Sequence, residues 1–215
     1  MTKQIFALFL SLTFLFSCAI VSYASDGFNK AVFDNAPDVF VTKDEMTGDL
    51  IATSESLLGD KGIAIPESGG GYVRVYSGAN ISDEMNLNAL IFQYHADNWA
   101  FINSIIIKIG NKRYKFDNIN MSRDVLRDAT IEEDAGLGMT SSALPMMADL
   151  IAHRDEEIRV RLQGDLRDID FVLTDDIKNG IINIYNLYVA GGGTSSASMK
   201  KVDLGSKVTV TVGQD

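Results

Sequence analysis

Two segments rich in apolar residues lie on either side of Gly110-Asn111, a pair typical of a two-residue hairpin loop. The segments span residues 102–109 and 112–116, and the loop determines which positions face each other across the ribbon. One side of this hairpin is predicted to be apolar, with Ile107 opposite Tyr114. The other side is basic and carries Lys108, Arg113 and Lys115.

A second hairpin is predicted over residues 157–163 and 166–173, where apolar residues again take every second position. With Gly164-Asp165 as its loop, we expect two apolar cross-strand pairs, Val160 with Ile169 and Ile158 with Phe171. The same register predicts two pairs of opposite charge, Arg161 with Asp168 and Arg159 with Asp170. Such exposed pairs contribute only about 0.2–1 kcal/mol each, but they agree with the apolar pairs.

Two helices are predicted from apolar residues at helical spacing. The first spans about residues 143–153, and the second begins after Thr174, a typical N-terminal cap, and ends at Gly191. Further strands are expected around residues 39–41, 50–52, 72–76, 87–94 and 207–212. We expect a short helix after Ser122 and an irregular loop at Glu132-Glu133-Asp134, whose charges could also neutralise a basic sheet face.

These elements predict an α+β fold, an antiparallel β-sheet built from hairpins with two main helices packed on one face. Residues 25–190 are expected to form a single domain, and residues 191–215 a Gly/Ser-rich connection and a C-terminal strand. Residues 1–24 are predicted to be a secretory signal peptide, because Lys3 precedes an apolar run and Ala24 completes a small-residue cleavage pattern. We therefore expect an exported protein, periplasmic or extracellular, with no transmembrane segment.

Cys18, the only cysteine, indicates a second possible route to the cell envelope. Leu15-Phe16-Ser17-Cys18 partly resembles the bacterial lipobox, in which the cysteine is acylated and becomes the first residue. Phe16 is bulkier than that motif prefers, and the residues after Cys18 stay apolar. The alternative is therefore an envelope lipoprotein anchored through Cys18. Cleavage after Ala24 would instead leave a chain without cysteine, which excludes disulfides and thiol catalysis.

A net charge of −10 means that phosphate backbones and anionic lipid headgroups repel this chain. We therefore expect no nucleic-acid partner, unless a local basic patch overrides the total charge. The hydrophobic fraction of 46% is that of an ordinary globular protein and excludes wholesale disorder. The glycine runs lack the pattern and the following helix of a phosphate-binding loop, so no cofactor is expected.

Residues suited to catalysis are scarce, since the chain has only two histidines, His95 and His153, and no GxSxG or HExxH motif. His153 ends a predicted helix, where a cation interacts favourably with the helix dipole. We therefore expect no catalytic residues and favour a protein that is not an enzyme. The alternative is a carboxylate-based hydrolase of the cell envelope, which would show two facing carboxylates, one with a raised pKa.

A cluster of aspartates around the second hairpin suggests a cation site, because hard cations such as calcium bind groups of oxygen atoms. The candidate ligands are Asp165, Asp168 and Asp170. The arginine partners predicted for Asp168 and Asp170 explain these carboxylates without a metal, so no metal is expected.

The basic face of the first hairpin has no such explanation within the chain. One interpretation of its three cations, Lys108, Arg113 and Lys115, is a solvated face whose charges prevent aggregation at the edge of the sheet. The other makes them the candidate binding residues, with an acidic protein or a surface glycan as the partner that they would fit. The sequence thus favours an exported, non-catalytic binding or interaction protein whose ligand is not identified.

Overall fold

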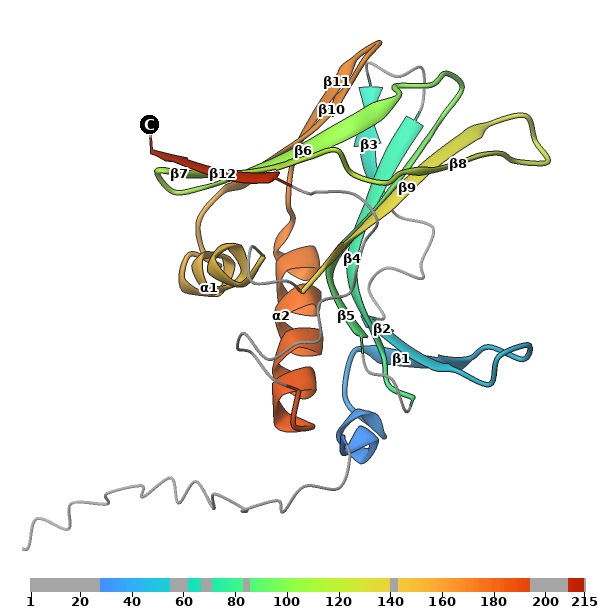
Figure 1. The fold of residues 1–215 in the computed structure, drawn as a ribbon, viewed down its shortest axis with the longest axis vertical. Coiled ribbons are helices and arrows are strands. Elements are labelled where there is room, and N and C mark those ends of the chain that lie inside the picture. Colours follow the sequence, from blue (N-terminus) through green and yellow to red (C-terminus); the bar gives the residue numbers. More distant parts are fainter. Residues whose placement is uncertain are drawn as a thin grey trace, which may run out of the picture.

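The computed structural model describes residues 28–54, 62–66, 71–82, 86–139, 143–193 and 209–214. It is an α+β fold of antiparallel sheets and two α-helices, which confirms the predicted fold class (Figure 1). The strands divide over two sheets, which we call sheet A and sheet B. The predicted signal peptide, its cleavage site and Cys18 lie outside the described residues.

Sheet A is the larger sheet, and all its neighbouring strands are antiparallel. Its strand order is β1-β2-β4-β5-β9-β8, and β3 also pairs with β4. The strands are β1 (Val39–Lys43), β2 (Leu50–Ser54), β3 (Ile63–Ile65), β4 (Gly71–Asn80), β5 (Asn86–Ala96), β8 (Ser122–Val125) and β9 (Ile131–Gly138). Alternate residues of β4 and β5, such as Val75 and Phe92, are fully buried, so one face of the sheet covers the core.

Sheet B has the order β11-β10-β6-β7-β12. Its strands are β6 (Ile102–Ile109), β7 (Lys112–Asp117), β10 (Ile158–Gly164), β11 (Asp168–Val172) and β12 (Thr209–Gln214). The register predicted for the first hairpin is confirmed, since Ile107 pairs with Tyr114 across Gly110-Asn111. Gly110 has a φ of +55°, a conformation that favours glycine in this tight loop.

The register predicted for the second hairpin is wrong by two residues. Val160 pairs with Phe171 rather than with Ile169, and Arg161 pairs with Asp170. The turn is longer than expected because the backbone N–H groups of Asp165 and Leu166 donate to the carbonyls of residues 101 and 100. A shift of two residues keeps every side chain on its expected face, so the predicted burial of Phe171 still holds.

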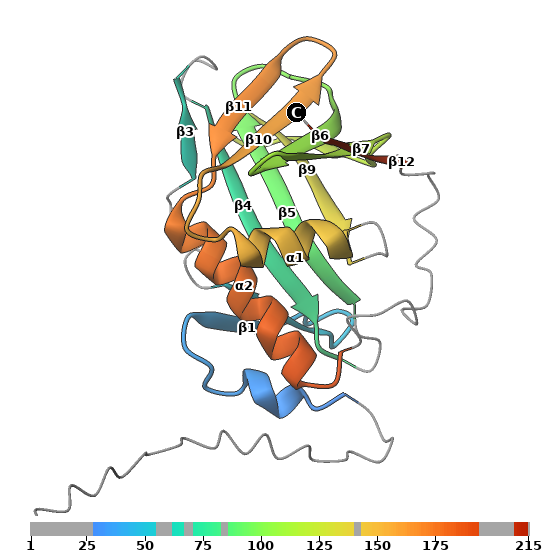
Figure 2. The same ribbon diagram turned by 90° about the vertical axis from the view of Figure 1, so that its left-hand side faces the viewer.

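Two predicted helices are present as α1 (Leu144–Ala152) and α2 (Asp175–Ala190), and a 3-10 turn η1 (Lys30–Phe33) precedes β1. Thr174 caps α2 as predicted, with its side chain accepting from the Ile177 N–H. Figure 2 shows both helices on the same side of sheet A. No helix among the described residues has the length and apolar character needed to cross a membrane.

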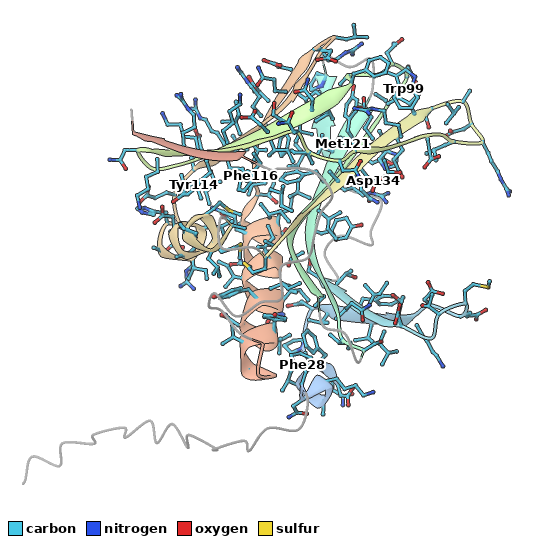
Figure 3. The ribbon with its side chains drawn as sticks, in the orientation of Figure 1. Phe28, Trp99, Tyr114, Phe116, Met121 and Asp134 are labelled. Atoms are coloured by element: carbon cyan, nitrogen blue, oxygen red, sulfur yellow. The ribbon has the colours of Figure 1, made fainter. Side chains whose placement is uncertain are left out.

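Helix α1 is fastened to sheet B by polar contacts from β7. The Tyr114 hydroxyl donates to Asp149 Oδ2, and the Lys112 Nζ lies 2.8 Å from the same oxygen. Burial, reinforced by this hydrogen bond, raises the pKa of Tyr114. Figure 3 shows Tyr114 and Phe116 on the β7 strand above α1, where both side chains are buried.

Two predictions for residues 122–134 are wrong. Ser122 begins the strand β8 rather than a helix, because this segment pairs with β9. Glu132-Glu133-Asp134 lies within β9 rather than in a loop. An inward-facing charge at Glu133, between the buried Ile131 and Ala135, hides the apolar alternation that would have indicated a strand.

Glu133 holds together the place where the chain passes from sheet A to sheet B. Its fully buried carboxylate accepts hydrogen bonds from the backbone N–H groups of residues 100, 101 and 102, at 2.7, 2.9 and 2.8 Å. The Arg123 Nε donates to the same carboxylate at 3.2 Å, and its Nη2 donates to the Ile102 carbonyl at 2.7 Å. We call this group the joint; it orients β6, and with it sheet B, relative to β9.

Candidate functional site

The candidate binding residues lie together on the outer face of sheet B, opposite its buried face. Lys108 pairs with Arg113 on one side and with Arg159 on the other, so three cations form one row across β7, β6 and β10. Neighbouring strands are about 4.8 Å apart, which places these side chains within reach of a single ligand. The neighbours of these residues in sequence, Ile107 and Tyr114 among them, face the core.

A second row follows along the strands, two residues further on. It contains Arg161, Ile106 and Lys115. The Arg161 guanidinium binds Asp170 through two contacts of 2.6 Å, and Lys115 Nζ lies 2.8 Å from Asp117 Oδ1. The cations of this row contact carboxylates of the same face, and in the first row the Arg159 Nε donates to Glu157.

The first row, together with Arg161 and Ile106 of the second, lines an open hollow of about 570 Å³. Ile106 contributes an apolar floor between the cations, and Val172, 42% exposed, contributes an apolar edge on β11. A volume of this size lies in the range of ligand sites in proteins, about 300–1,000 Å³. The hollow therefore offers cationic donors and apolar contact surface together.

The predicted aspartate cluster is used for internal contacts. The hydrogen bond from Arg161 holds the pKa of Asp170 below its usual range, and Asp168 lies 3.4 Å from the same guanidinium. Asp165 accepts a hydrogen bond of 2.6 Å from the Asn103 side chain. Within the described part of the chain, no group of three or more acidic, histidine or cysteine side chains could hold a metal ion.

Sequence reasoning found Lys108, Arg113 and Lys115 but missed that Arg159 and Arg161 complete the same face. The missing step was the pairing of β6 with β10, which joins the two hairpins into one sheet. Both hairpins present one cationic strand, and this shared feature is the signal that could have suggested that the two strands are neighbours.

Sheet A carries a second polar face, on the side of β4, β5 and β9 that points away from the helices. His95 Nε2 lies 3.0 Å from Glu132 Oε2, although the two groups are not aligned as a hydrogen bond. The Tyr72 ring stacks on the His95 ring with centroids 4.5 Å apart, and the Arg74 guanidinium lies 5.2 Å from the Tyr72 ring. Asp134, labelled in Figure 3, follows Glu132 on the same face of β9.

Burial shifts the protonation of His95 and Glu132 in opposite directions. It lowers the pKa of His95, and the nearby charge of Arg74 lowers it further. It raises the pKa of Glu132, and the carboxylates of Asp134 and Asp124 add to that rise. Each group is therefore charged less readily than in water, which is an environment that acid–base chemistry can use.

His153 has a structural explanation that agrees with the prediction. It is the C-terminal cap residue of α1, and its Nδ1 lies 2.8 Å from Glu156 Oε1. The two histidines are on different elements, His95 in β5 and His153 at the end of α1.

Comparison with protein-family models, with curated protein sequences and with solved structures found no match to this chain. Neither its fold nor its function is therefore assigned by likeness to another protein.

Proposed function

We propose that this chain is an exported, non-catalytic interaction protein that uses the basic face of sheet B to dock an acidic protein surface. The observation that carries this proposal is the row of Arg159, Lys108 and Arg113 beside the hollow. On a protein whose net charge is −10, this face is a local reversal of sign, and such a reversal steers acidic partners to one place.

Three features favour an acidic protein over an anionic glycan. Arginine presents a planar fork that binds carboxylates through two parallel hydrogen bonds, as Arg161 already does with Asp170. Ile106 and Val172 give the apolar contact that protein interfaces use beside such charges. The one aromatic residue that lines the hollow, Phe171, is only 7% exposed, so it offers little surface for a sugar ring.

Binding of poly-L-glutamate to a charge-reversed protein tests the proposal. The variant Lys108→Glu/Arg113→Glu is expected to lose at least about tenfold in affinity for the fluorescently labelled polymer, because two contacts become repulsive. The matched control, Lys30→Glu/Lys43→Glu, changes the net charge equally on exposed residues outside sheet B and is expected to bind like the wild type. Circular dichroism confirms that each variant folds.

Two outcomes of that experiment would contradict the proposal. Equal losses in both variants would show that the polymer senses only net charge. Binding of heparin without binding of poly-L-glutamate would show that the face recognises an anionic glycan instead of a protein.

Export is the second part of the proposal, and the amino-terminal pattern supports it. Mass spectrometry of the mature protein is expected to show an amino terminus at Ser25. A diacylglyceryl group on Cys18 would instead support the envelope lipoprotein, and an intact Met1 would contradict export altogether.

A carboxylate-based hydrolase is the second candidate, and the raised pKa of Glu132 beside two carboxylates and His95 favours it. In that function Glu132 would donate a proton to a leaving group. Hydrolysis of cell-envelope polymers should then be abolished by Glu132→Gln and retained by Asp128→Asn, a change at the exposed β8–β9 turn. Equal product release by the wild type and the Glu132→Gln variant would reject this candidate.

A further inference from the structure

We propose that the acidic surface that docks on the basic face is the β8–β9 hairpin of a second copy of this chain. This inference rests on the proposed function of the basic face and names its partner. It assigns a role to the acidic run at residues 132–134, which the sequence suggested could neutralise a basic sheet face.

The outer face of the β8–β9 hairpin is a set of carboxylates held on a sheet. Asp124 pairs with Glu132 across the two strands, and Asp134 follows Glu132 along β9. Asp128 adds a fully exposed carboxylate at the tip, fixed by its hydrogen bonds to Thr130. The cations of the same hairpin are Arg127, at the tip, and Arg123, which is engaged with Glu133.

The spacing of these carboxylates matches the spacing of the cations, because both sets lie on antiparallel strands. Asp124 and Glu132 are separated by one strand spacing of about 4.8 Å, as are Arg159 and Lys108. Glu132 and Asp134 are separated by two residues along a strand, about 6.8 Å, as are Arg159 and Arg161, of which Arg161 also binds Asp170. The carboxylates of the hairpin and the cations of the basic face therefore have the same spacing. When the two surfaces meet, each carboxylate can lie opposite a cation.

The two surfaces cannot meet within one molecule. The hairpin belongs to sheet A and the basic face to sheet B, and Figure 1 shows β8 and β9 on the right of the molecule while β7 and β12 lie on the left. The joint holds the hairpin in place, since Arg123 of β8 and Glu133 of β9 both bind the start of β6. Contact between unlike surfaces of two copies leaves one of each surface open, so it propagates as a head-to-tail chain.

Sedimentation velocity of the purified wild-type protein tests this directly. Because exposed charges are screened within about 10 Å at about 0.1 M salt, we expect association at about 0.01 M salt and monomers at about 1 M salt. The basic-face variant Lys108→Glu/Arg113→Glu and the hairpin variant Asp124→Lys/Asp134→Lys should each be monomeric at low salt. The Lys30→Glu/Lys43→Glu control should still associate.

Mixing the two monomeric variants distinguishes lost docking from misfolding. The basic-face variant retains a functional hairpin and the hairpin variant retains a functional basic face, so an equal mixture should form dimers that extend no further. A chain carrying all four substitutions should regain part of the association, because the four substituted positions exchange sign while Arg159 and Glu132 keep theirs.

Several results would overturn the inference. These are a wild-type protein that stays monomeric at low salt, association that high salt leaves unchanged, or a mixture of variants that stays monomeric. If the wild type is monomeric but still binds poly-L-glutamate through Lys108 and Arg113, the partner is another acidic protein and the proposed function stands. If that binding also fails, both proposals are wrong.

Discussion

The two faces of β9 place successive glutamates in opposite surroundings. Glu133 points to the joint, where it is fully buried and accepts hydrogen bonds from three backbone N–H groups and from Arg123. Glu132 points to the outer face, where it lies among Asp124, Asp134 and His95 and its pKa is raised. Both residues belong to the same strand, and they lie on opposite faces because successive side chains of a β-strand point to opposite sides of the sheet.

The comparison shows that a carboxylate has a different role on each face of β9. At the joint, each oxygen of a buried carboxylate meets donors that were positioned by the backbone, so the charge stabilises the contact between the sheets. On the outer face, by contrast, more hydrogen-bond acceptors than donors surround the carboxylates. The carboxylates therefore repel one another. The first arrangement serves the fold, whereas the second leaves charge available for a partner.

The largest expected effect comes from breaking the joint. Glu133→Gln puts an amide NH₂ where donors already converge, so we expect the free energy of unfolding to fall by about 3 kcal/mol. Urea denaturation measures this fall. The matched control is Glu132→Gln on the opposite face, and an equal effect of the two substitutions would contradict the comparison.

The substitution Gly164→Ala is expected to disturb the joint from the side of the β10–β11 hairpin. A Cβ at residue 164 would lie 2.3 Å from the Ala100 carbonyl oxygen and 2.8 Å from that of Arg167, and both obstacles are backbone. We expect a loss of about 1–3 kcal/mol, since the turn must move away from residue 100. Gly138→Ala, where nothing lies within 4 Å of the new Cβ, provides the control. Similar melting temperatures for the two variants would show that the turn is not fastened to the joint.

The variant Glu132→Gln tests the same comparison through the pH dependence of stability. Because the folded protein raises the pKa of Glu132, its stabilising contribution is complete below the ordinary value of 4.5 and is lost as pH rises through the folded pKa. Glutamine remains uncharged throughout. The variant should therefore match the wild type at about pH 4 and be more stable at about pH 8, by at most about 0.5 kcal/mol because solvent screens the site. Thermal unfolding at both pH values measures it, and a variant less stable at about pH 8 would contradict it.

Local pattern predicted the hairpin of β6 and β7 completely, because a two-residue loop leaves one register and the apolar residues agree with it. It also predicted both helices, because both repeat apolar positions at helical spacing and α2 lies between the caps Thr174 and Gly191. It missed β9, since Glu133 occupies a core position whose donors come from residues 100–102, far away in sequence. Long-range partners of this kind leave no trace in a local pattern.

The same limit explains what was missed at the candidate site. Lys108, Arg113 and Lys115 were recognisable within one hairpin, whereas Arg159 joins them only through the pairing of β10 with β6. The two-residue error in the β10–β11 register has a related cause, because contacts with residues 100 and 101 set the turn. Alternation fixes which face a side chain takes, but it does not fix its partner.

The pairing of β6 with β10 has a consequence for when the row of cations forms. Ile109 meets Ile158 across that pairing, so a long loop that includes α1 must close before the row of cations exists. Contacts of such sequence separation slow folding, because the entropy of loop closure is lost before the contacts form. If the chain is exported, as proposed, in unfolded form, its arginines and lysines are scattered along its length during that passage, and the row of cations forms only after folding.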